Sequence, residues 1–346
     1  MSIRWGILGC GDVCEVKSGP ALQQARGSEL RAVMRRDRAK AEDFARRHGV
    51  PRFYDDADEL IADPEVDAVY VATPPGSHLE LALRVAAAGK PAYVEKPMAR
   101  THQECLRLLA AFEAAQQPLF VAYYRRALPR FLKARELLSQ LGAVSRIHVR
   151  YASNGQGRHR GTPSLPWRLQ AEHAGGGLFM DLASHTLDVL DFLFGPLEDV
   201  DGRASRSASL GAGNVEDTVE LTFRTTSGAL GSGSWTFIEP AYEDRITITG
   251  ERGSLTLATF GDGPLTLELG GEPQQHTLQN PKHIQLPLVQ TIVDSLRGQG
   301  TCPSTGLSAA RTSAVLDRAL LGYYGSRDDG FWRAPERWPG LSPVVQ

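Results

Sequence analysis

The stretch IRWGILGCGDVC, residues 3–14, decides the fold of the amino-terminal part of the chain. An apolar run, residues 3–8, leads into a glycine turn, and a helical pattern follows. Strand, glycine turn and helix in this order are the setting in which such a motif binds a dinucleotide, although the turn alone is also compatible with no ligand. Gly9 allows the tight turn, Gly11 lets the backbone approach a pyrophosphate, and Cys14 at the third position is small enough for close helix packing. We expect cofactor contacts from Gly9, Gly11, Asp12 and Val13.

Outward from this stretch, the first 122 residues alternate short apolar runs with amphipathic helical stretches. Strands alternating with helices of about 10–15 residues predict a parallel sheet with helices on both faces. The expected strands are residues 3–8, 30–34, 68–72, 92–95 and 119–122. The expected helices include residues 38–47, 77–88 and 102–115. The fold class is therefore α/β at this end, with a Rossmann dinucleotide-binding domain over residues 1–122.

After about residue 142 the sequence pattern changes to period-two alternation. Ile147, Val149 and Tyr151 alternate with His148 and Arg150, which is typical of an antiparallel strand with one buried face. Similar runs are residues 219–223, 235–237, 245–249, 254–257 and 265–269, and two helices are expected near residues 284–297 and 307–323. Residues 123–346 are therefore predicted to form an α+β domain with a large, mostly antiparallel open sheet, which binds substrate and pairs chains as a homodimer or homotetramer.

Composition limits the classes of partner. The 346 residues carry 38 Lys and Arg against 40 Asp and Glu, a net charge of −2, and 42% of them are hydrophobic. This balance argues against a nucleic-acid-binding surface, and no apolar run approaches the roughly 20 residues that cross a bilayer. The four cysteines are too few for a disulfide framework. We expect a cytoplasmic protein that acts on a small molecule.

The end of the second strand predicts which dinucleotide is bound. An acidic residue there accepts hydrogen bonds from the ribose 2′-hydroxyl of NAD, whereas arginine pairs with the 2′-phosphate of NADP. Arg35 occupies this position, and Arg36, which follows it, can stack on the adenine or join the phosphate; the alternative is that both arginines are solvated loop charges. Asp37 would serve NAD only if the strand ended late. NADP is favoured over NAD.

Two further motifs carry ionisable groups. Lys96 follows the fourth expected strand within Glu95-Lys96-Pro97, where open α/β sheets bind ligands, although a surface lysine before a turn is the simpler reading. The run GGGLFMDLASH, residues 175–185, places Asp181 and His185 four residues apart, so the carboxylate can tune the imidazole. On a regular helix, Asp188 would extend this stripe along one face. No third ligand is spaced for a metal, so no metal site is expected.

Together these motifs resemble the glucose–fructose oxidoreductase/inositol dehydrogenase (Gfo/Idh/MocA) family. The resemblance rests on GCGDVC (residues 9–14), ATPPGSH (72–78), EKP (95–97) and GGGLFMDLASH (175–185), and it covers nearly the whole chain. It implies a catalytic set of Lys96, Asp181 and His185. It also implies that Thr73, Pro74 and His78 line the cofactor path and that Glu95 lies near the nicotinamide ribose. Cys14 and Arg35 depart from the pattern of many members.

The expected activity is an NAD(P)-dependent dehydrogenase or reductase acting on the CH–OH group of a sugar, cyclic polyol or related hydroxy compound. Lys96 and His185 would handle the hydroxyl proton. Substrate contacts are expected from Arg125 and Trp167. An NAD-dependent glycoside hydrolase of the same family and a cofactor-binding regulator without turnover remain the alternatives.

Overall fold

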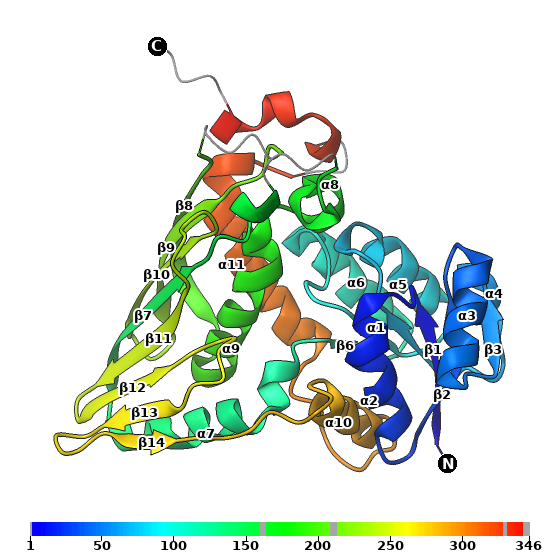
Figure 1. Cartoon of the computed structure of the whole chain (residues 1–346), viewed down its shortest axis with the longest axis horizontal. Helices are drawn as coiled ribbons and strands as arrows, with labels where there is room; N and C mark the ends of the chain where they lie inside the picture. Colours follow the sequence, from blue (N-terminus) through cyan, green and yellow to red (C-terminus); the bar gives the residue numbers. More distant parts are fainter. Residues whose placement is uncertain (1, 160–163, 208–212, 328–330, 342–346) are drawn as a thin grey trace. The chain divides into compact units, whose positions relative to one another are not determined.

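The computed structural model describes residues 2–159, 164–207, 213–327 and 331–341, which belong to two compact units. One unit comprises Met1–Leu128 and Pro281–Ala310, and the other comprises Pro129–Asn280 and Arg311–Gln346 (Figure 1). Pro281–Ala310 therefore groups with the unit that carries the glycine turn, whereas we expected this segment in the second domain. The predicted fold class itself, Rossmann domain plus mostly antiparallel sheet, is confirmed.

The first unit contains a six-stranded parallel sheet in the order β3-β2-β1-β4-β5-β6. Its strands are β1 (Ile3–Leu8), β2 (Ser28–Met34), β3 (Arg52–Tyr54), β4 (Ala68–Val71), β5 (Ala92–Val94) and β6 (Leu119–Val121). Its helices are α1 (Asp12–Val16), α2 (Ser18–Gln24), α3 (Arg38–His48), α4 (Ala57–Ala62), α5 (His78–Ala87), α6 (His102–Ala114) and α10 (Leu286–Leu296), with short turns η1 (Pro75–Ser77) and η2 (Tyr124–Ala127). The strand order reverses direction between β1 and β4, and ligands bind outside the carboxyl ends of strands at such a point.

The helix after the glycine turn is interrupted, which the sequence pattern did not predict. Lys17 separates α1 from α2. Pro20 lacks the N–H that would bond to the carbonyl of Val16, and its ring crowds that carbonyl, so a continuous helix cannot form across this point.

The segment that returns to the first unit is held by buried polar contacts. Gln285, immediately before α10, accepts a hydrogen bond from the hydroxyl of Tyr93 at 3.0 Å and donates one to Glu95 at 2.8 Å. The Ser304 hydroxyl donates to the carbonyl of Val121 at 2.7 Å. These contacts lie too far apart in sequence for periodicity to predict them.

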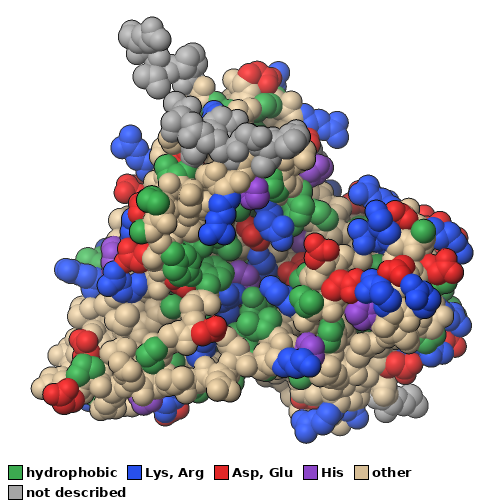
Figure 2. Space-filling model, viewed as in Figure 1, with side chains coloured by type: hydrophobic (Ala, Val, Ile, Leu, Met, Phe, Trp, Pro, Cys, Tyr) green, Lys and Arg blue, Asp and Glu red, His purple; other side chains and the backbone are tan. Residues whose placement is uncertain are grey.

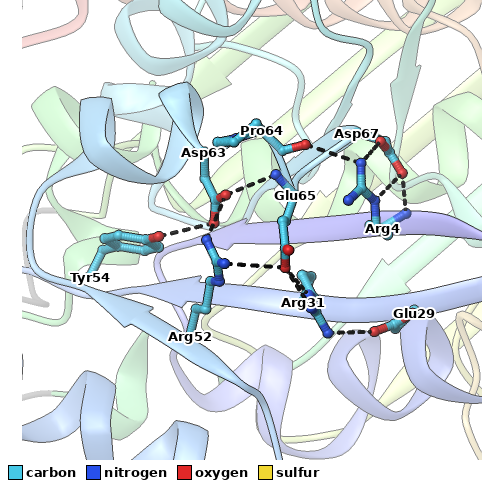
Figure 3. Close-up of polar contacts among 9 residues, drawn as sticks. All are labelled: Arg4, Glu29, Arg31, Arg52, Tyr54, Asp63, Pro64, Glu65 and Asp67. Carbon is cyan, nitrogen blue, oxygen red and sulfur yellow. Dashed lines mark hydrogen bonds and ion pairs between the residues drawn. The ribbon is translucent and has the colours of Figure 1, made fainter.

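An ionic network lies toward the amino ends of the parallel strands, at the edge opposite the glycine turn. Arg4 pairs with Asp67 at 2.7 Å, and Arg52 pairs with Asp63 at 2.9 Å. Figure 3 shows the network, which joins Arg4, Glu29, Arg31, Arg52, Tyr54, Asp63, Pro64, Glu65 and Asp67. It ties the loop before β4 to the first three strands.

Asp63 is the buried centre of this network, so Asp63→Asn is expected to destabilise the protein by about 2 kcal/mol and to lower Tm by about 5 °C at neutral pH. Burial opposes ionisation of Asp63, but hydrogen bonds from the Glu65 amide, the Tyr54 hydroxyl and Arg52 outweigh it and lower the pKa of the carboxyl. The stabilisation is therefore full above the unfolded-state pKa of about 3.9 and disappears as pH falls through the lower folded-state pKa.

Thermal unfolding followed from pH 3 to pH 7, a window of about four units around that unfolded-state pKa, checks this expectation. Glu29→Gln is the matched control, because Glu29 contacts only the exposed side of Arg31 among the hydrogen bonds above and should change stability by less than about 0.5 kcal/mol. Equal Tm values for Asp63→Asn and Glu29→Gln at pH 7 would contradict the assigned role of Asp63.

The second unit contains an eight-stranded sheet in the order β14-β13-β12-β11-β7-β10-β9-β8, in which only β7 and β10 pair in parallel among the described pairings. Its strands are β7 (Val144–Ala152), β8 (Leu197–Ser205), β9 (Thr218–Thr225), β10 (Leu230–Thr236), β11 (Glu243–Gly250), β12 (Gly253–Leu257), β13 (Leu265–Glu268) and β14 (Gln274–His276). Its helical segments are α7 (Pro129–Leu138), α8 (Ala171–Ala174), α9 (Ser184–Phe194), α11 (Gly306–Tyr324, which begins in the first unit), η3 (Ser139–Leu141), η4 (Gly157–His159), η5 (Trp167–Leu169), η6 (Phe179–Ala183), η7 (Phe331–Arg333), η8 (Pro335–Arg337) and η9 (Pro339–Leu341).

One face of this sheet is covered by helices and the other is open (Figure 1). The alternation predicted for β7 is confirmed, with Ile147 and Val149 buried and His148 exposed. At Gly202 in β8, a side-chain carbon would lie 2.5 Å from the α carbon of Ala319, so α11 packs directly on the strand backbone. The open face carries a groove of about 720 Å³ lined by Arg146, His148, Arg150, Ser232, Glu243, Arg245, Thr247 and Thr249.

On the face drawn in Figure 2, basic and acidic side chains are interspersed over the first unit, and neither sign forms a continuous patch there. Within the described parts of the chain, no helix is both long enough and apolar enough to cross a membrane.

Candidate active site

The glycine turn forms at the carboxyl end of β1, as predicted. Gly9 has φ +87°, which favours glycine, and a side chain on it would lie 2.6 Å from the methyl of Thr73. Gly11 is different, because among the described residues only the Gly9 carbonyl oxygen lies within 4 Å of a side-chain carbon built on it, at 3.9 Å. Cys14 is buried, with Sγ 3.9 Å from the same carbonyl. The turn is therefore tight on the protein side and open at Gly11.

The remaining predicted residues of this turn begin α1, where Asp12 is exposed and Val13 is half-buried. The loop after β4 lies against the turn through the contact of Thr73 with Gly9. The Ser77 hydroxyl donates to Thr73 Oγ1 at 2.8 Å, and Pro74 is exposed. The structure therefore brings the glycine turn and the ATPPGSH motif, residues 72–78, to one edge of the sheet.

His78 is fully buried rather than open to a ligand. Its Nε2 lies 2.7 Å from the Thr73 carbonyl oxygen, and its Nδ1 lies 3.0 Å from that of Pro97. Burial lowers the pKa of the imidazole. The ring thereby bridges the loop after β4 to the turn that follows Lys96, and any influence on a cofactor acts through these backbone contacts.

The residues after β2 differ in what they contact. Arg35 is half-buried, and its Nη1 lies 3.5 Å from the carbonyl oxygen of Cys10 in the glycine turn, while Arg36 is exposed. Asp37 caps α3 by accepting from the Lys40 amide at 3.2 Å, and it pairs with the Lys40 ammonium at 3.1 Å. The hydrogen bond from Lys40 lowers the pKa of Asp37. The aspartate is therefore engaged by the helix that it begins.

Glu95 and Lys96 follow β5 at the same edge. Glu95 is buried, and its Oε1 accepts from the Tyr70 hydroxyl at 2.6 Å and from Gln285 at 2.8 Å. Its Oε2 accepts from the backbone amide of Lys96 at 3.1 Å. Lys96 itself is half-buried and precedes a cis peptide to Pro97. These contacts fix the backbone from which the Lys96 side chain extends, and sequence reasoning missed Gln285 because nothing near it marks the contact.

Arg125, predicted to contact substrate, is buried in η2 after β6. Its guanidinium lies over the ring of Tyr124, 5.0 Å from the ring centroid. Arg125 therefore belongs to the first unit together with Lys96.

In the second unit, Asp181 and His185 follow the three glycines on a local π-helical turn. The π turn spans Phe179–Ala183, and α9 begins at Ser184. Single π turns inside helices occur frequently at functional sites. His185 is nine-tenths buried or more, with its ring 5.8 Å from that of Phe260.

The expectation of a continuous acid–histidine stripe is wrong at Asp188. This residue is fully buried and accepts a hydrogen bond from the Thr312 hydroxyl of α11 at 3.4 Å. His185 and Asp188 both lie in the regular helix α9, so the π turn shifts only Asp181 relative to them, and the difference at Asp188 arises because this face of α9 packs against α11.

Trp167 and Asp181 are linked through a residue that sequence reasoning did not select. Arg168 Nε donates to Asp181 Oδ2 at 3.1 Å, and its guanidinium lies 4.3 Å from the ring of Trp167. Trp167 is half-buried, and Arg168 is exposed. Arg168 could have been selected from the sequence because it directly follows Trp167. In the described residues, no three metal-ligating side chains gather to hold an ion.

Comparison with known proteins agrees with this geometry. Residues 3–123 match the family model described as "Oxidoreductase family, NAD-binding Rossmann fold", and residues 131–256 match the GFO/IDH/MocA C-terminal domain. Oxidoreductase P35 of Formosa agariphila is 36% identical over 91% of this chain and 97% of its own length. The 1,5-anhydro-D-fructose reductase of Ensifer adhaerens is 27% identical over 94% and 99%.

Solved structures show the same fold. The aldose-aldose oxidoreductase of Caulobacter crescentus, complexed with glycerol, superposes with a TM-score of 0.81 at 25% identity, covering 93% of this chain and 98% of that one. A levoglucosan dehydrogenase complex with NADH and levoglucosan gives a TM-score of 0.80 at 21% identity, covering 92% and 98%.

The fold and the two family matches define a dinucleotide-binding oxidoreductase of the dehydrogenase and reductase class. The chain belongs to the Gfo/Idh/MocA family. The residues present fit a nicotinamide dinucleotide, because Gly11 is open on the ligand-binding edge where Gly9 and Thr73 are closely packed.

Proposed function

We propose that this protein transfers a hydride reversibly between the nicotinamide of NADP(H) and a carbinol or carbonyl carbon of a sugar, cyclic polyol or related hydroxy compound. The activities for which its relatives are named support the substrate class, since they include a 1,5-anhydro-D-fructose reductase and an inositol 2-dehydrogenase. The observation that carries the proposal is the placement of Lys96 after β5, at the same edge of the sheet as the glycine turn that is open at Gly11, with its backbone fixed through Glu95.

In the proposed reaction, the bound cofactor supplies the hydride chemistry. Oxidation of the alcohol removes a hydride from carbon and a proton from oxygen, and His185 as neutral imidazole takes that proton. The Lys96 ammonium donates a hydrogen bond to the same oxygen and stabilises the negative charge that develops on it. Asp181 holds the imidazole in one orientation, and reduction reverses each step.

Arg125 and Trp167 are proposed to contact substrate hydroxyl or anionic groups, and Arg168 joins them because it reaches Asp181. A screen of sugars, cyclic polyols and hydroxy acids, followed by nicotinamide absorbance with each cofactor, tests the proposed function. Turnover of one of these classes is expected. Cofactor binding without turnover of any of them would overturn the proposed reaction and favour a regulator, whereas release of nitrophenol from nitrophenyl glycosides would favour the hydrolase.

We propose NADP rather than NAD because of the residues after β2. Arg35 lies beside the glycine turn, Arg36 is exposed, and the carboxylate of Asp37, two residues after Arg35, is engaged by Lys40. An arginine fork suits a phosphate monoester, and a free carboxylate is what a ribose 2′-hydroxyl needs.

Arg35→Ser is accordingly expected to weaken NADPH binding about tenfold to a hundredfold, since a charge-assisted contact is lost, and to leave NADH binding unchanged. Fluorescence titration with both cofactors measures the two dissociation constants. Arg46→Ser is the control, because Arg46 is an exposed arginine of α3 that pairs with Asp43. Equal weakening of NADPH and NADH by Arg35→Ser would contradict a phosphate-reading role.

Two further proposals concern the setting of the enzyme. The open sheet face, with its groove of about 720 Å³, is the surface proposed for a homodimer or homotetramer, and light scattering measures the mass. All four cysteines are free and buried, which suits the reducing cytoplasm that we propose as its compartment.

A further inference from the structure

The last of the three glycines before Asp181 is required by a buried carboxylate that no motif identified. Glu216, fully buried just before β9, accepts from the Gly177 amide with both carboxylate oxygens, each at 2.9 Å. A side-chain carbon on Gly177 would lie 2.5 Å from the Glu216 backbone oxygen and 3.1 Å from Oε1. Glycine at 177 is therefore what allows the carboxylate to reach the backbone.

A second set of contacts holds the same turn from the end of α11. The Tyr324 hydroxyl donates to Glu216 Oε2 at 2.5 Å. Arg327, which follows the helix, donates to the Gly175 carbonyl oxygen at 3.0 Å and pairs with Asp317. The Gly175–Gly177 backbone is thus fixed on its donor side by Glu216 and on its acceptor side by Arg327.

This turn leads directly into the π segment. Gly177 is two residues before Phe179, where the π turn begins, and the N-terminal residue Leu178 has no side-chain cap. We propose that Glu216 is a positioning residue that sets the orientation of the segment carrying Asp181 and His185. Only the kcat measurements below rest on the proposed function. The contact between Glu216 and the glycine turn does not depend on it.

The ionisation of Glu216 agrees with this role. Burial raises the pKa of Glu216 to about 7, although hydrogen bonds from Tyr324 and Gly177 and the charge of Arg327 oppose the rise. Tyr323 also faces the carboxyl, and its own pKa is raised chiefly by burial and secondarily by Glu216. A carboxyl whose folded-state pKa exceeds its unfolded-state value of about 4.3 destabilises the fold increasingly as pH rises from that value to about 7. The negative charge of Glu216 therefore does not stabilise the fold. What Glu216 contributes to the structure is its hydrogen-bonded contact with the turn at Gly177.

Three variants separate positioning from bulk stability. Glu216→Leu removes the acceptor, whereas Glu216→Gln keeps one acceptor for Gly177 and one donor for Tyr324 without the charge. Tyr324→Phe removes one hydroxyl. The matched control is Tyr323→Phe, because Tyr323 is the adjacent buried tyrosine and donates to the Asn214 carbonyl oxygen at 2.8 Å instead.

Hydrogen exchange over residues 175–185 is the first measurement, because it needs no substrate. Glu216→Leu is expected to increase exchange there while Tyr323→Phe leaves it unchanged, and unchanged exchange in Glu216→Leu would overturn the proposal whatever the activity. The second measurement is kcat beside the cofactor Kd. We expect kcat about tenfold lower or more for Glu216→Leu and about threefold lower for Tyr324→Phe, with Kd unchanged.

Glu216→Gln distinguishes positioning by hydrogen bonds from an effect of the carboxylate charge. It should retain most of the wild-type kcat and raise Tm above pH 7, with the gain disappearing as pH falls toward about 4. A kcat for Glu216→Gln as low as that of Glu216→Leu would overturn positioning by hydrogen bonds. A wild-type enzyme without turnover on any sugar or polyol would count against the proposed function, and the exchange result would still decide the role of Glu216.

Discussion

Lys96→Ala is expected to lower kcat about a thousandfold while leaving the Kd for the cofactor within about twofold of wild type. The ammonium is proposed to act on the reacting oxygen, where charge develops only during the reaction, so its loss should affect the chemical step more than cofactor binding. The backbone of Lys96 is held through Glu95 by Tyr70 and Gln285, and these contacts do not depend on the lysine side chain. Steady-state kinetics and a fluorescence titration of the same preparation check both parts.

Lys90→Ala is the matched control for this experiment. Lys90 precedes β5 and donates to the Asp63 carbonyl oxygen at 2.8 Å, so the two lysines flank opposite ends of one strand. Lys90→Ala should lower stability without lowering kcat. Unchanged turnover in Lys96→Ala, or an equal loss in both variants, would refute the catalytic assignment.

His185→Asn is expected to lower kcat about a hundredfold or more, because the asparagine amide cannot take the hydroxyl proton. Asparagine keeps a polar, planar side chain of similar reach beside Phe260, so the packing of this buried position is least disturbed. Imidazole added to the buffer should restore part of the activity by supplying the missing base. Cofactor Kd should remain at the wild-type value.

The control for His185→Asn is His173→Asn in α8, an exposed histidine of the same unit whose ring lies 3.5 Å from Glu172. It should match wild type in kcat and in stability. If His185→Asn keeps wild-type turnover, or if added imidazole raises the turnover of His173→Asn and His185→Asn by the same factor, the imidazole of His185 is not the proton carrier.

Local patterns predicted the elements that interact with their neighbours in sequence. The parallel strands, the period-two strands of the second sheet and helices such as α3 and α6 all carry their own periodicity, and the structure contains them within a few residues. The strand β3 was missed because its three residues, Arg52–Tyr54, are only half-buried and form no apolar run, unlike the equally short β5 and β6. The placement of α10 in the first unit depends on Gln285 meeting Glu95, a contact that spans 190 residues.

In the candidate site too, local patterns predicted the elements, whereas contacts between residues far apart in sequence were missed. The glycine turn and the residues after β5 lie at one edge of the sheet because parallel strands bring their carboxyl ends together. Sequence patterns did not predict the partners that hold these residues, which are Gln285 for Glu95, Arg168 for Asp181 and Glu216 for Gly177. The π turn escaped prediction because it depends on a local change in helical pitch, and the burial of Asp188 escaped it because its partner Thr312 lies 124 residues away on α11.

The return of α10 to the first unit has a consequence for folding during synthesis. At about 5–20 residues per second, a ribosome needs on the order of ten to thirty seconds to proceed from the end of η2 to the end of α10. Throughout that interval the nascent parallel sheet lacks Gln285, and the buried carboxyl of Glu95 lacks one of its donors. The nucleotide-binding unit is therefore completed only after the strands of the other unit have been translated, and the two halves of the enzyme mature in an order that the gene sequence alone does not suggest.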